Sequence, residues 1–280
     1  MALGFRNRRS IYKTPDELSA MVAPGLATAA SLAAVRAAIR PGATTLELDA
    51  IAEKTIREAG GVPNFMKEPG YHHTICTSIN DDVVHGIPGG RVLQPGDIVS
   101  IDSGAELGGW NGDAAFSVVV PDATKPGVVA ERQRLADDTE QSLWHGIAAL
   151  ATASHLGEVG AAIEDYLDAH GAYGILEDYV GHGIGRSMHE EPSVFNYRVR
   201  DRGAEVKPGL VVAIEPMVTL GGIDTYVKDD GWTVTTSDGS SAAHWEHSVA
   251  VHDGGIWVLT AEDGGAAGLA ALGVVPVPVR

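Results

Sequence analysis

Two carboxylates lie in the middle of apolar stretches of this chain. Asp102 lies within residues 95–104 (PGDIVSIDSG), and Glu215 lies within residues 208–217 (PGLVVAIEPM). Both stretches begin with Pro-Gly and are followed by a Gly-Gly pair, so they read as two copies of one unit. A carboxylate in an apolar strand is costly unless a partner offsets its lost hydration. Two acids at equivalent positions indicate a shared partner, and a cation is the simplest one.

The first copy predicts a β-hairpin that brings a further acid to the site. If Gly108-Gly109 form a two-residue turn, residue 104 lies opposite residue 113. Asp102 and Asp113 then share one face as diagonal neighbours, roughly 7 to 8 Å apart. A slip of one residue in register would place them on opposite faces, and two solvated acids beside a turn remain the alternative.

Three histidines and one glutamate extend the set of candidate residues. His85 opens a His-Gly-Ile-Pro segment, His182 lies among glycines, and His189 opens His-Glu-Glu-Pro. Glu246 lies in a strand pattern in which Trp245, Val249 and Val251 would face the core and Glu246 the opposite side. Taken singly, a histidine is more often a structural residue than a ligand, and a glutamate on a strand is usually solvated.

Two predicted helices precede the first hairpin. Thr14 to Glu17 have the pattern of a capping box with proline at the first helical position, so a helix begins there. Pro24-Gly25 predict a kink or an interruption before the helix resumes and ends at Pro41-Gly42. A second helix is predicted from Thr44 or Thr45 to Gly60-Gly61.

The same order of elements recurs in the second half of the chain. Glu47, Ala50, Glu53 and Gly60 recur at one offset as residues 158, 161, 164 and 171. This predicts an internal duplication, with halves of about 14–130 and 131–263 forming one α+β domain with pseudo-twofold symmetry. We expect a curved antiparallel sheet with helices on one face and a cleft on the other. Residues 1–13 and 264–280 are expected to be tails, the second one loose.

Composition limits the possible partners and compartment. The chain has 280 residues and a net charge of −17, which argues against nucleic-acid and anionic-membrane binding. Its one cysteine, Cys76, excludes an intramolecular disulfide and fits a reducing compartment, so we expect a cytoplasmic protein. Residues 1–13 are basic but lack an apolar core, so they predict neither a signal peptide nor a membrane span. This basic end is expected to be a solvated tail, with docking to the ribosome as the alternative.

Taken together, the motifs resemble one known family over about residues 14 to 260. The set comprises His85–Pro88, Ile101-Asp102 with Asp113 after ten intervening residues, Gly181–Gly185, His189–Pro192, Ile214–Met217 and Glu246-His247. It resembles the type I methionine aminopeptidases, which have the pita-bread (creatinase-like) fold. The ordered set is specific, although each motif alone is weak.

The resemblance implies a site for two divalent metal ions. Asp102 would hold one ion, His182 and Glu215 the other, and Asp113 and Glu246 would bridge the two. Such an oxygen-rich ligand set suits Mn²⁺, Fe²⁺ or Co²⁺ as well as Zn²⁺. The implied reaction uses a metal-bridging hydroxide to release the N-terminal methionine of nascent peptides when the second residue is small.

The resemblance also implies roles for individual residues in a monomeric enzyme. His189 would contact the scissile carbonyl, His85 the backbone of the second substrate residue, and Glu215 would carry the proton. Tyr71, Cys76, Met188 and Trp232 would form the methionine pocket, although Met188 and Trp232 could equally be core residues. The chain departs from the family between Phe65 and His73, where one pocket aromatic is missing.

Three other interpretations compete with this one. A prolidase or Xaa-Pro aminopeptidase uses the same ligands but carries a large N-terminal domain, whereas about a dozen residues precede the first predicted helix here. A type II methionine aminopeptidase has a long insertion between His189 and Glu215, where this chain has 25 residues. A non-enzymatic pita-bread binding protein would have lost its ligands, and all five ligand positions are acidic or histidine here.

Overall fold

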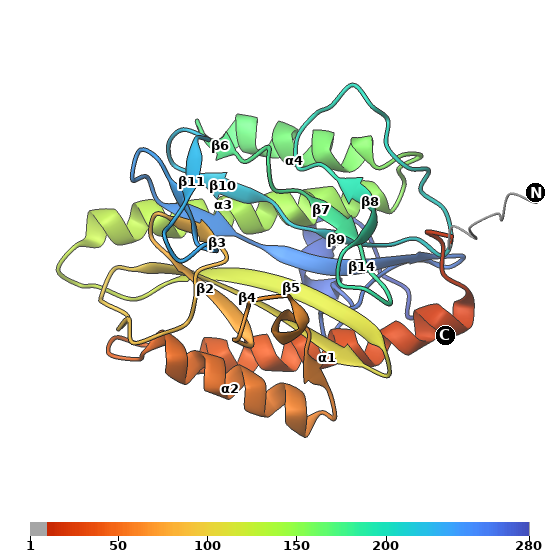
Figure 1. The fold of residues 1–280 in the computed structure, drawn as a ribbon. Helices are drawn as coiled ribbons and strands as arrows, with labels where there is room; N and C mark the ends of the chain where they lie inside the picture. The colour runs from red at the N-terminus through yellow and green to blue at the C-terminus, as the bar shows by residue number, and fades with distance from the viewer. Residues whose placement is uncertain (1–9, 280) are drawn as a thin grey trace, which may run out of the picture.

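A curved, mainly antiparallel sheet forms the centre of the molecule (Figure 1). The structure is a computed structural model that describes residues 10–279. The sheet has nine strands, seven of them in the order β1-β4-β5-β14-β9-β7-β8, while β2 pairs with β4 and β15 with β14. The strands are β1 (Val62–Pro63), β2 (Ile75–Ile79), β4 (Ile98–Leu107), β5 (Trp110–Val119), β7 (Gly181–Gly183), β8 (Glu190–Val194), β9 (Val211–Ile214), β14 (Glu246–His252) and β15 (Gly255–Val258).

Two small sheets flank this central one. They have the orders β13-β10-β6 and β11-β12-β3. Their strands are β3 (Asp82–Val84), β6 (Gly174–Ile175), β10 (Met217–Thr219), β11 (Thr225–Val227), β12 (Val234–Thr236) and β13 (Ala242–His244).

Helices pack in two pairs, with α1 beside α2 and α3 beside α4 (Figure 1). An apolar core lies between these helices and the sheet, and it includes Leu48 of α2, Ile101 of β4 and Leu143 of α3. The helices are α1 (Pro15–Ala38), α2 (Thr45–Glu58), α3 (Pro126–Leu150), α4 (Gly157–His170) and α5 (Ala266–Leu269), with 3₁₀ turns η1 (Phe65–Lys67) and η2 (Ala270–Leu272).

Elements from the two predicted halves meet at one seam. One half contributes α1, α2, β4 and β5, and the other contributes α3, α4, β9 and β14. The halves join where β5 pairs with β14, with Glu246 opposite Ala115. Residues at the seam therefore come from both halves.

The β4–β5 hairpin has the predicted register. Leu107 pairs with Trp110 across the two-residue turn, and Gly104 pairs with Asp113. Gly108 and Gly109 have φ values of 57° and 77°, which residues with a side chain rarely adopt. Asp102, two residues from Gly104, thus lies on the same face of the sheet as Asp113.

The prediction that Pro24-Gly25 could interrupt the first helix is wrong. The helix α1 is continuous from Pro15 to Ala38, and both residues are buried within it. Gly25 lies so close to the backbone of Leu259 that a Cβ there would be 2.3 Å from the Leu259 oxygen. Tertiary packing therefore outweighs the local cost of the proline.

The expectation of a loose C-terminal tail is also wrong for the described residues after 263. Leu269 of α5 is fully buried, and the Val277 N–H donates to the Ile256 carbonyl at 2.9 Å. Gly268 lies directly against the ring of Trp144 on α3. The segment packs through small residues and single apolar contacts, which leave no periodic pattern in the sequence.

Part of the predicted N-terminal tail is docked as well. The Tyr12 hydroxyl donates to the Glu205 carbonyl at 2.8 Å, and the Lys13 ammonium lies 2.8 Å from the Glu190 carboxylate. Residues 10–13 therefore belong to the folded unit, and the remaining basic residues of the predicted tail lie outside the described part of the chain.

The helix α1 has the length and hydropathy of a membrane span, but it packs as a core helix. Half of its most apolar window is buried inside the protein. Its buried side chains, which include Met21 and Val35, face the rest of the protein.

Candidate metal centre and its pocket

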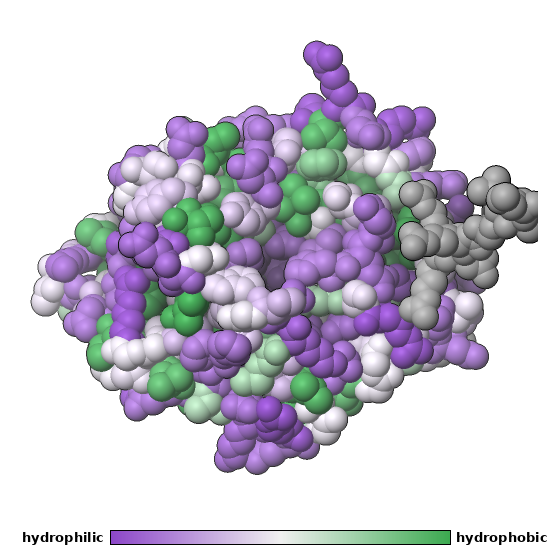
Figure 2. Space-filling model, viewed as in Figure 1, coloured by the Kyte–Doolittle hydropathy of each residue, from purple (hydrophilic) through white to green (hydrophobic). Residues whose placement is uncertain are grey.

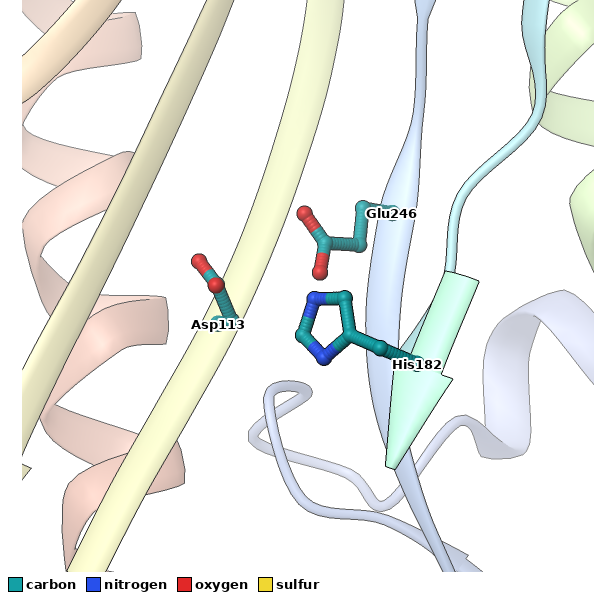
Figure 3. Close-up of side chains that lie close together, drawn as sticks. All are labelled: Asp113, His182 and Glu246. Carbon is teal, nitrogen blue, oxygen red and sulfur yellow. The ribbon is translucent and has the colours of Figure 1, made fainter. Parts of the chain in front are cut away.

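Acidic side chains from both halves meet at the seam. Asp102 and Asp113 lie on the paired strands β4 and β5, while Glu215 follows β9 and Glu246 begins β14. His182 approaches from β7, which pairs with β9. Figure 3 shows Asp113, His182 and Glu246 pointing toward one another from three different strands. Together these five residues are called the acid cage below.

The arrangement of His182 leaves one ring nitrogen free for the cage. Its Nδ1 lies 3.0 Å from the Gly183 carbonyl, to which it can donate, while its Nε2 lies 3.4 Å from Glu215 Oε1. Gly181 and Gly183 permit this placement, because a Cβ at either would lie within 2.3 Å of a carbonyl oxygen of a neighbouring strand. The glycines around His182 thus make room for adjacent strands.

A serine hydroxyl fixes the backbone of Asp113 across the seam. The Ser248 hydroxyl donates to the Asp113 carbonyl at 2.7 Å and accepts from the Asp113 N–H at 3.1 Å. On β5, the register with β14 covers Ala114 and Ala115, so this side chain continues the strand contact at Asp113. Ser248 and Asp113 are both buried.

The cage is chemically incomplete without a cation. Asp102 Oδ1, Asp113 Oδ1 and Glu246 Oε1 are buried and have no hydrogen-bond partner among the described residues. Ligand atoms of Asp113, His182 and Glu246 lie within 4.8 Å of one another, as do those of Glu215, His244 and Glu246. Buried oxygens without partners are costly, and divalent cations would satisfy them. The donor set therefore fits divalent metal ions.

The pKa values of all four acids in the cage are raised, mainly by burial. Burial raises the pKa of Asp102 and of Glu215 to about 7, with the nearby histidines opposing the rise. Burial, with repulsion from the neighbouring acids, raises the pKa of Asp113 and of Glu246 well above their ordinary values. Positive charge at the centre of the cage would favour the ionised forms.

One cavity of about 320 Å³ joins the cage to the remaining predicted residues. Figure 2 shows a hollow near the middle of the molecule on the face seen in Figure 1. Every side chain predicted for the site lines this cavity: Tyr71, Cys76, His85, Asp102, Asp113, His182, Met188, His189, Glu215, Trp232 and Glu246. Sequence reasoning thus named side chains that the tertiary structure brings together.

His85 and His189 line the same cavity, where burial favours their uncharged forms. Burial lowers the pKa of His85 to about 4, and desolvation also lowers the pKa of His189. The His189 ring meets that of His182 edge to face, with centroids 4.4 Å apart. His85 has a φ of 59°, an uncommon conformation for a residue with a side chain, and its ring contacts Tyr179.

The far part of the cavity is apolar. Phe65, Tyr71, Cys76 and Met188 form one buried cluster, with Trp232 packed against it. The Tyr71 and Trp232 rings meet at an angle of 65° with centroids 5.0 Å apart. Met188 and Trp232 therefore line the cavity and also pack against other side chains.

Sequence reasoning missed several residues of the cavity. Phe65 lies in the apolar cluster, and Glu68 lines the cavity within the segment that diverges from the family pattern. The most notable omission is His244, which is fully enclosed beside the cage. Its position two residues before Glu246 was the available signal, because extended chain turns side chains at that spacing to the same side. In the structure His244 ends β13 and Glu246 begins β14.

The fold and the site define a class of protein, and comparison with known proteins gives the family. A curved antiparallel sheet that gathers carboxylates and an imidazole into an ion-sized cage is that of a pita-bread metal-dependent hydrolase. Residues 20–253 match the sequence pattern of metallopeptidase family M24. The chain belongs to this family.

Relatives and solved structures agree with this assignment. Methionine aminopeptidase 1 of Mycobacterium tuberculosis is 49% identical over 263 residues, which cover 91% of this chain and 97% of the relative. Methionine aminopeptidase 1 of Bacillus subtilis is 40% identical over 252 residues, which cover 89% and 98%. The methionine aminopeptidase structure from Rickettsia prowazekii matches with a TM-score of 0.82 at 36% identity, covering 89% of this chain and 99% of that one. These matches confirm the predicted family and fold.

A more distant match shows the fold alone. The prolidase of Pyrococcus furiosus matches with a TM-score of 0.68 at 20% identity, covering 90% of this chain and 65% of that one. The prolidase alternative is therefore weaker than the methionine aminopeptidase interpretation.

Proposed function

We propose that this metallopeptidase removes the N-terminal methionine of nascent proteins when the second residue is small. The observation that carries the proposal is that one cavity is lined both by the acid cage and by the apolar cluster. The methionine aminopeptidases that resemble the chain over nearly its whole length support it.

Two divalent ions are proposed for the cage, with Co²⁺, Mn²⁺, Fe²⁺ and Zn²⁺ as candidates. Asp102 would hold one, His182 and Glu215 the other, and Asp113 and Glu246 would lie between them. Such ions activate a water molecule near neutral pH and polarise the scissile carbonyl. The side chains would hold the ions at the seam, because their strands are held by the paired sheet.

The three residues proposed for catalysis are His85, His189 and Glu215. His189 lines the cavity and would donate a hydrogen bond to the scissile carbonyl. His85 would hold the backbone of the second substrate residue, and its lowered pKa keeps it uncharged at neutral pH. Glu215 would carry the proton from the water to the departing amine, and the Asn196 amide holds its backbone carbonyl at 3.1 Å.

The apolar cluster is the proposed methionine subsite. Its lining residues are Tyr71, Cys76, Met188 and Trp232, with Phe65 added by the structure. Aromatic faces and edges suit a thioether, whose contacts with rings are worth about 0.3–1.5 kcal/mol each. Burial of the whole methionine side chain would contribute about 1.5–3 kcal/mol to binding. An acidic or basic first residue would lose this contribution and would also lose hydration.

A peptide assay tests the proposal directly. Purified protein is supplied with Co²⁺, Mn²⁺, Fe²⁺ or Zn²⁺ and offered Met-Ala-Ser, Met-Trp-Ser and an Xaa-Pro peptide. We expect release of methionine from Met-Ala-Ser, little from Met-Trp-Ser and no cleavage before proline. Cleavage of the Xaa-Pro peptide without any release of methionine would make the chain a prolidase-like hydrolase instead. Metal content below one ion per chain, with no cleavage of any peptide, would favour a binding protein.

The setting of the enzyme is part of the same proposal. We infer a monomer in the cytoplasm, built as one catalytic domain with halves of about 14–130 and 131–263. The single, buried cysteine supports a reducing compartment. Docking to the ribosome stays a prediction, because most of the basic segment that suggested it lies outside the described residues.

A further inference from the structure

His244 is a buried imidazole beside the cage that the proposed function has not used. Its residue is 2% exposed, and it lines the cavity. Neither Nδ1 nor Nε2 has a hydrogen-bond partner among the described residues. A neutral imidazole usually satisfies at least one nitrogen when buried, so this ring is an unsatisfied group that points to a ligand.

The backbone of His244 is fixed as firmly as that of Asp113. The Ser117 hydroxyl donates to the His244 carbonyl at 2.9 Å and accepts from its N–H at 2.9 Å. His244 also pairs with Met217 in the sheet β10–β13. The ring therefore has a defined position beside Glu215, two residues before Met217 in the chain.

The distances around Glu215 suggest that its two oxygens each face an imidazole. His182 Nε2 lies 3.4 Å from Oε1, and His244 Nε2 lies 3.6 Å from Oε2. Two donors bound to one ion at about 2.0–2.2 Å are separated by roughly 3–3.5 Å. The distance of 3.6 Å is too long for a hydrogen bond and close to the spacing of two ligands on one ion.

We propose that His244 is a nitrogen ligand of the metal centre, binding an ion together with Glu215 and Glu246. Ligand atoms of these three residues lie within 4.8 Å of one another. The inference deepens the proposed function and rests on it, because that function assigns only one imidazole, His182, to the centre. A second nitrogen ligand would shift the preference of the centre from Mn²⁺ toward Fe²⁺, Co²⁺ and Zn²⁺.

The alternative role is positioning, in which His244 only orients the carboxylate of Glu215. The variant His244→Gln separates the two roles, because its amide can still donate a hydrogen bond to Glu215 but supplies no ring nitrogen. His182→Gln is the matched control, since it removes the imidazole on the other oxygen of the same carboxylate.

The test counts nitrogen ligands and measures metal affinity. Electron spin-echo spectroscopy of the Mn²⁺-loaded protein should show two ¹⁴N imidazole couplings in the wild type and one in each variant. Calorimetric titration with Co²⁺ should show at least a tenfold weaker site in His244→Gln, because the variant keeps the hydrogen bond to Glu215 and loses only the nitrogen ligand. Unchanged couplings and an affinity within twofold of the wild type would overturn the proposal in favour of positioning.

A second measurement needs no variant and covers the case in which His244→Gln does not fold. Wild-type protein labelled with ¹⁵N-histidine and loaded with ¹¹³Cd²⁺ should show metal coupling to two imidazole nitrogens. Coupling to one imidazole would overturn the assignment of His244 and leave the metal-dependent function intact. Failure of the wild type to bind any divalent ion would contradict both, and so the two failures are distinguishable.

Discussion

The seam between the two halves can be tested through Ser248, whose hydroxyl holds the backbone of Asp113. The substitution Ser248→Ala removes one donor and one acceptor, at 2.7 and 3.1 Å, and leaves the Asp113 carbonyl and N–H without these partners. Both residues are buried, and Ser248 is fully so. Each orphaned buried group costs about 1–3 kcal/mol, so the loss of two partners should lower the free energy of unfolding by about 2–6 kcal/mol.

Metal affinity should fall together with stability, because the backbone that loses its support carries the side chain of Asp113, a residue of the acid cage. Loss of a supporting group of this kind typically lowers metal affinity 10–100-fold, and we expect about tenfold here. Urea unfolding of the metal-free protein, followed by circular dichroism, measures the first effect, and calorimetric titration with Co²⁺ measures the second. Ser193→Ala, at an exposed position of β8, is the control and should change neither. A Ser248→Ala protein within 0.5 kcal/mol of the wild type, a margin typical of surface substitutions, would refute the reasoning.

Three further predictions concern the cage, the subsite and pH. Asp113→Asn should lose metal and activity while staying folded. His189→Ala should keep its metal and lose about 10²–10³-fold in kcat, as loss of one carbonyl-binding donor does. Metal analysis and steady-state kinetics distinguish the two variants, and a normal rate for His189→Ala would contradict its role. Met188→Ala should raise KM for Met-Ala-Ser more than it lowers kcat, and an unchanged KM would place Met188 outside the subsite. The folded pKa of His85, about 4, is below its unfolded value of about 6.5, so the unfolded state takes up the proton first as pH falls. Stability supplied by the neutral ring is present above pH 6.5 and is lost toward pH 4. Over that range, urea unfolding should show the wild type losing at most about 3 kcal/mol of unfolding free energy relative to His85→Gln. A difference between the two proteins that does not change with pH would refute the prediction.

The site draws on strands from both predicted halves of the chain. Asp102 lies on β4 and Glu215 directly follows β9, while the seam strands β5 and β14 carry Asp113 and Glu246. Serine hydroxyls hold the seam in both halves, with Ser248 supporting Asp113 and Ser117 supporting His244. The parallel in support is a further reason to expect that His244, like Asp113, faces the metal centre.

Local patterns were sufficient for the elements and for the family. The capping boxes at Thr14 and Thr44 begin α1 and α2, and the Gly108-Gly109 turn sets the register that places Asp102 and Asp113 on one face. These features depend on hydrogen bonds and φ angles within a few residues, so they can be read from the sequence. The ordered motifs identified the family because their spacing is specific.

By itself, the sequence determined where α1 and α2 begin, the register of the β4–β5 hairpin, and which acidic and histidine residues could bind a cation. Only the tertiary structure decided that α1 continues through Pro24, that the C-terminal segment packs around Leu269, and that His244 is enclosed beside Glu215. Each of these depends on contacts between residues far apart in the chain. Burial, and the energetic cost of an unsatisfied buried group, arise only when those residues meet.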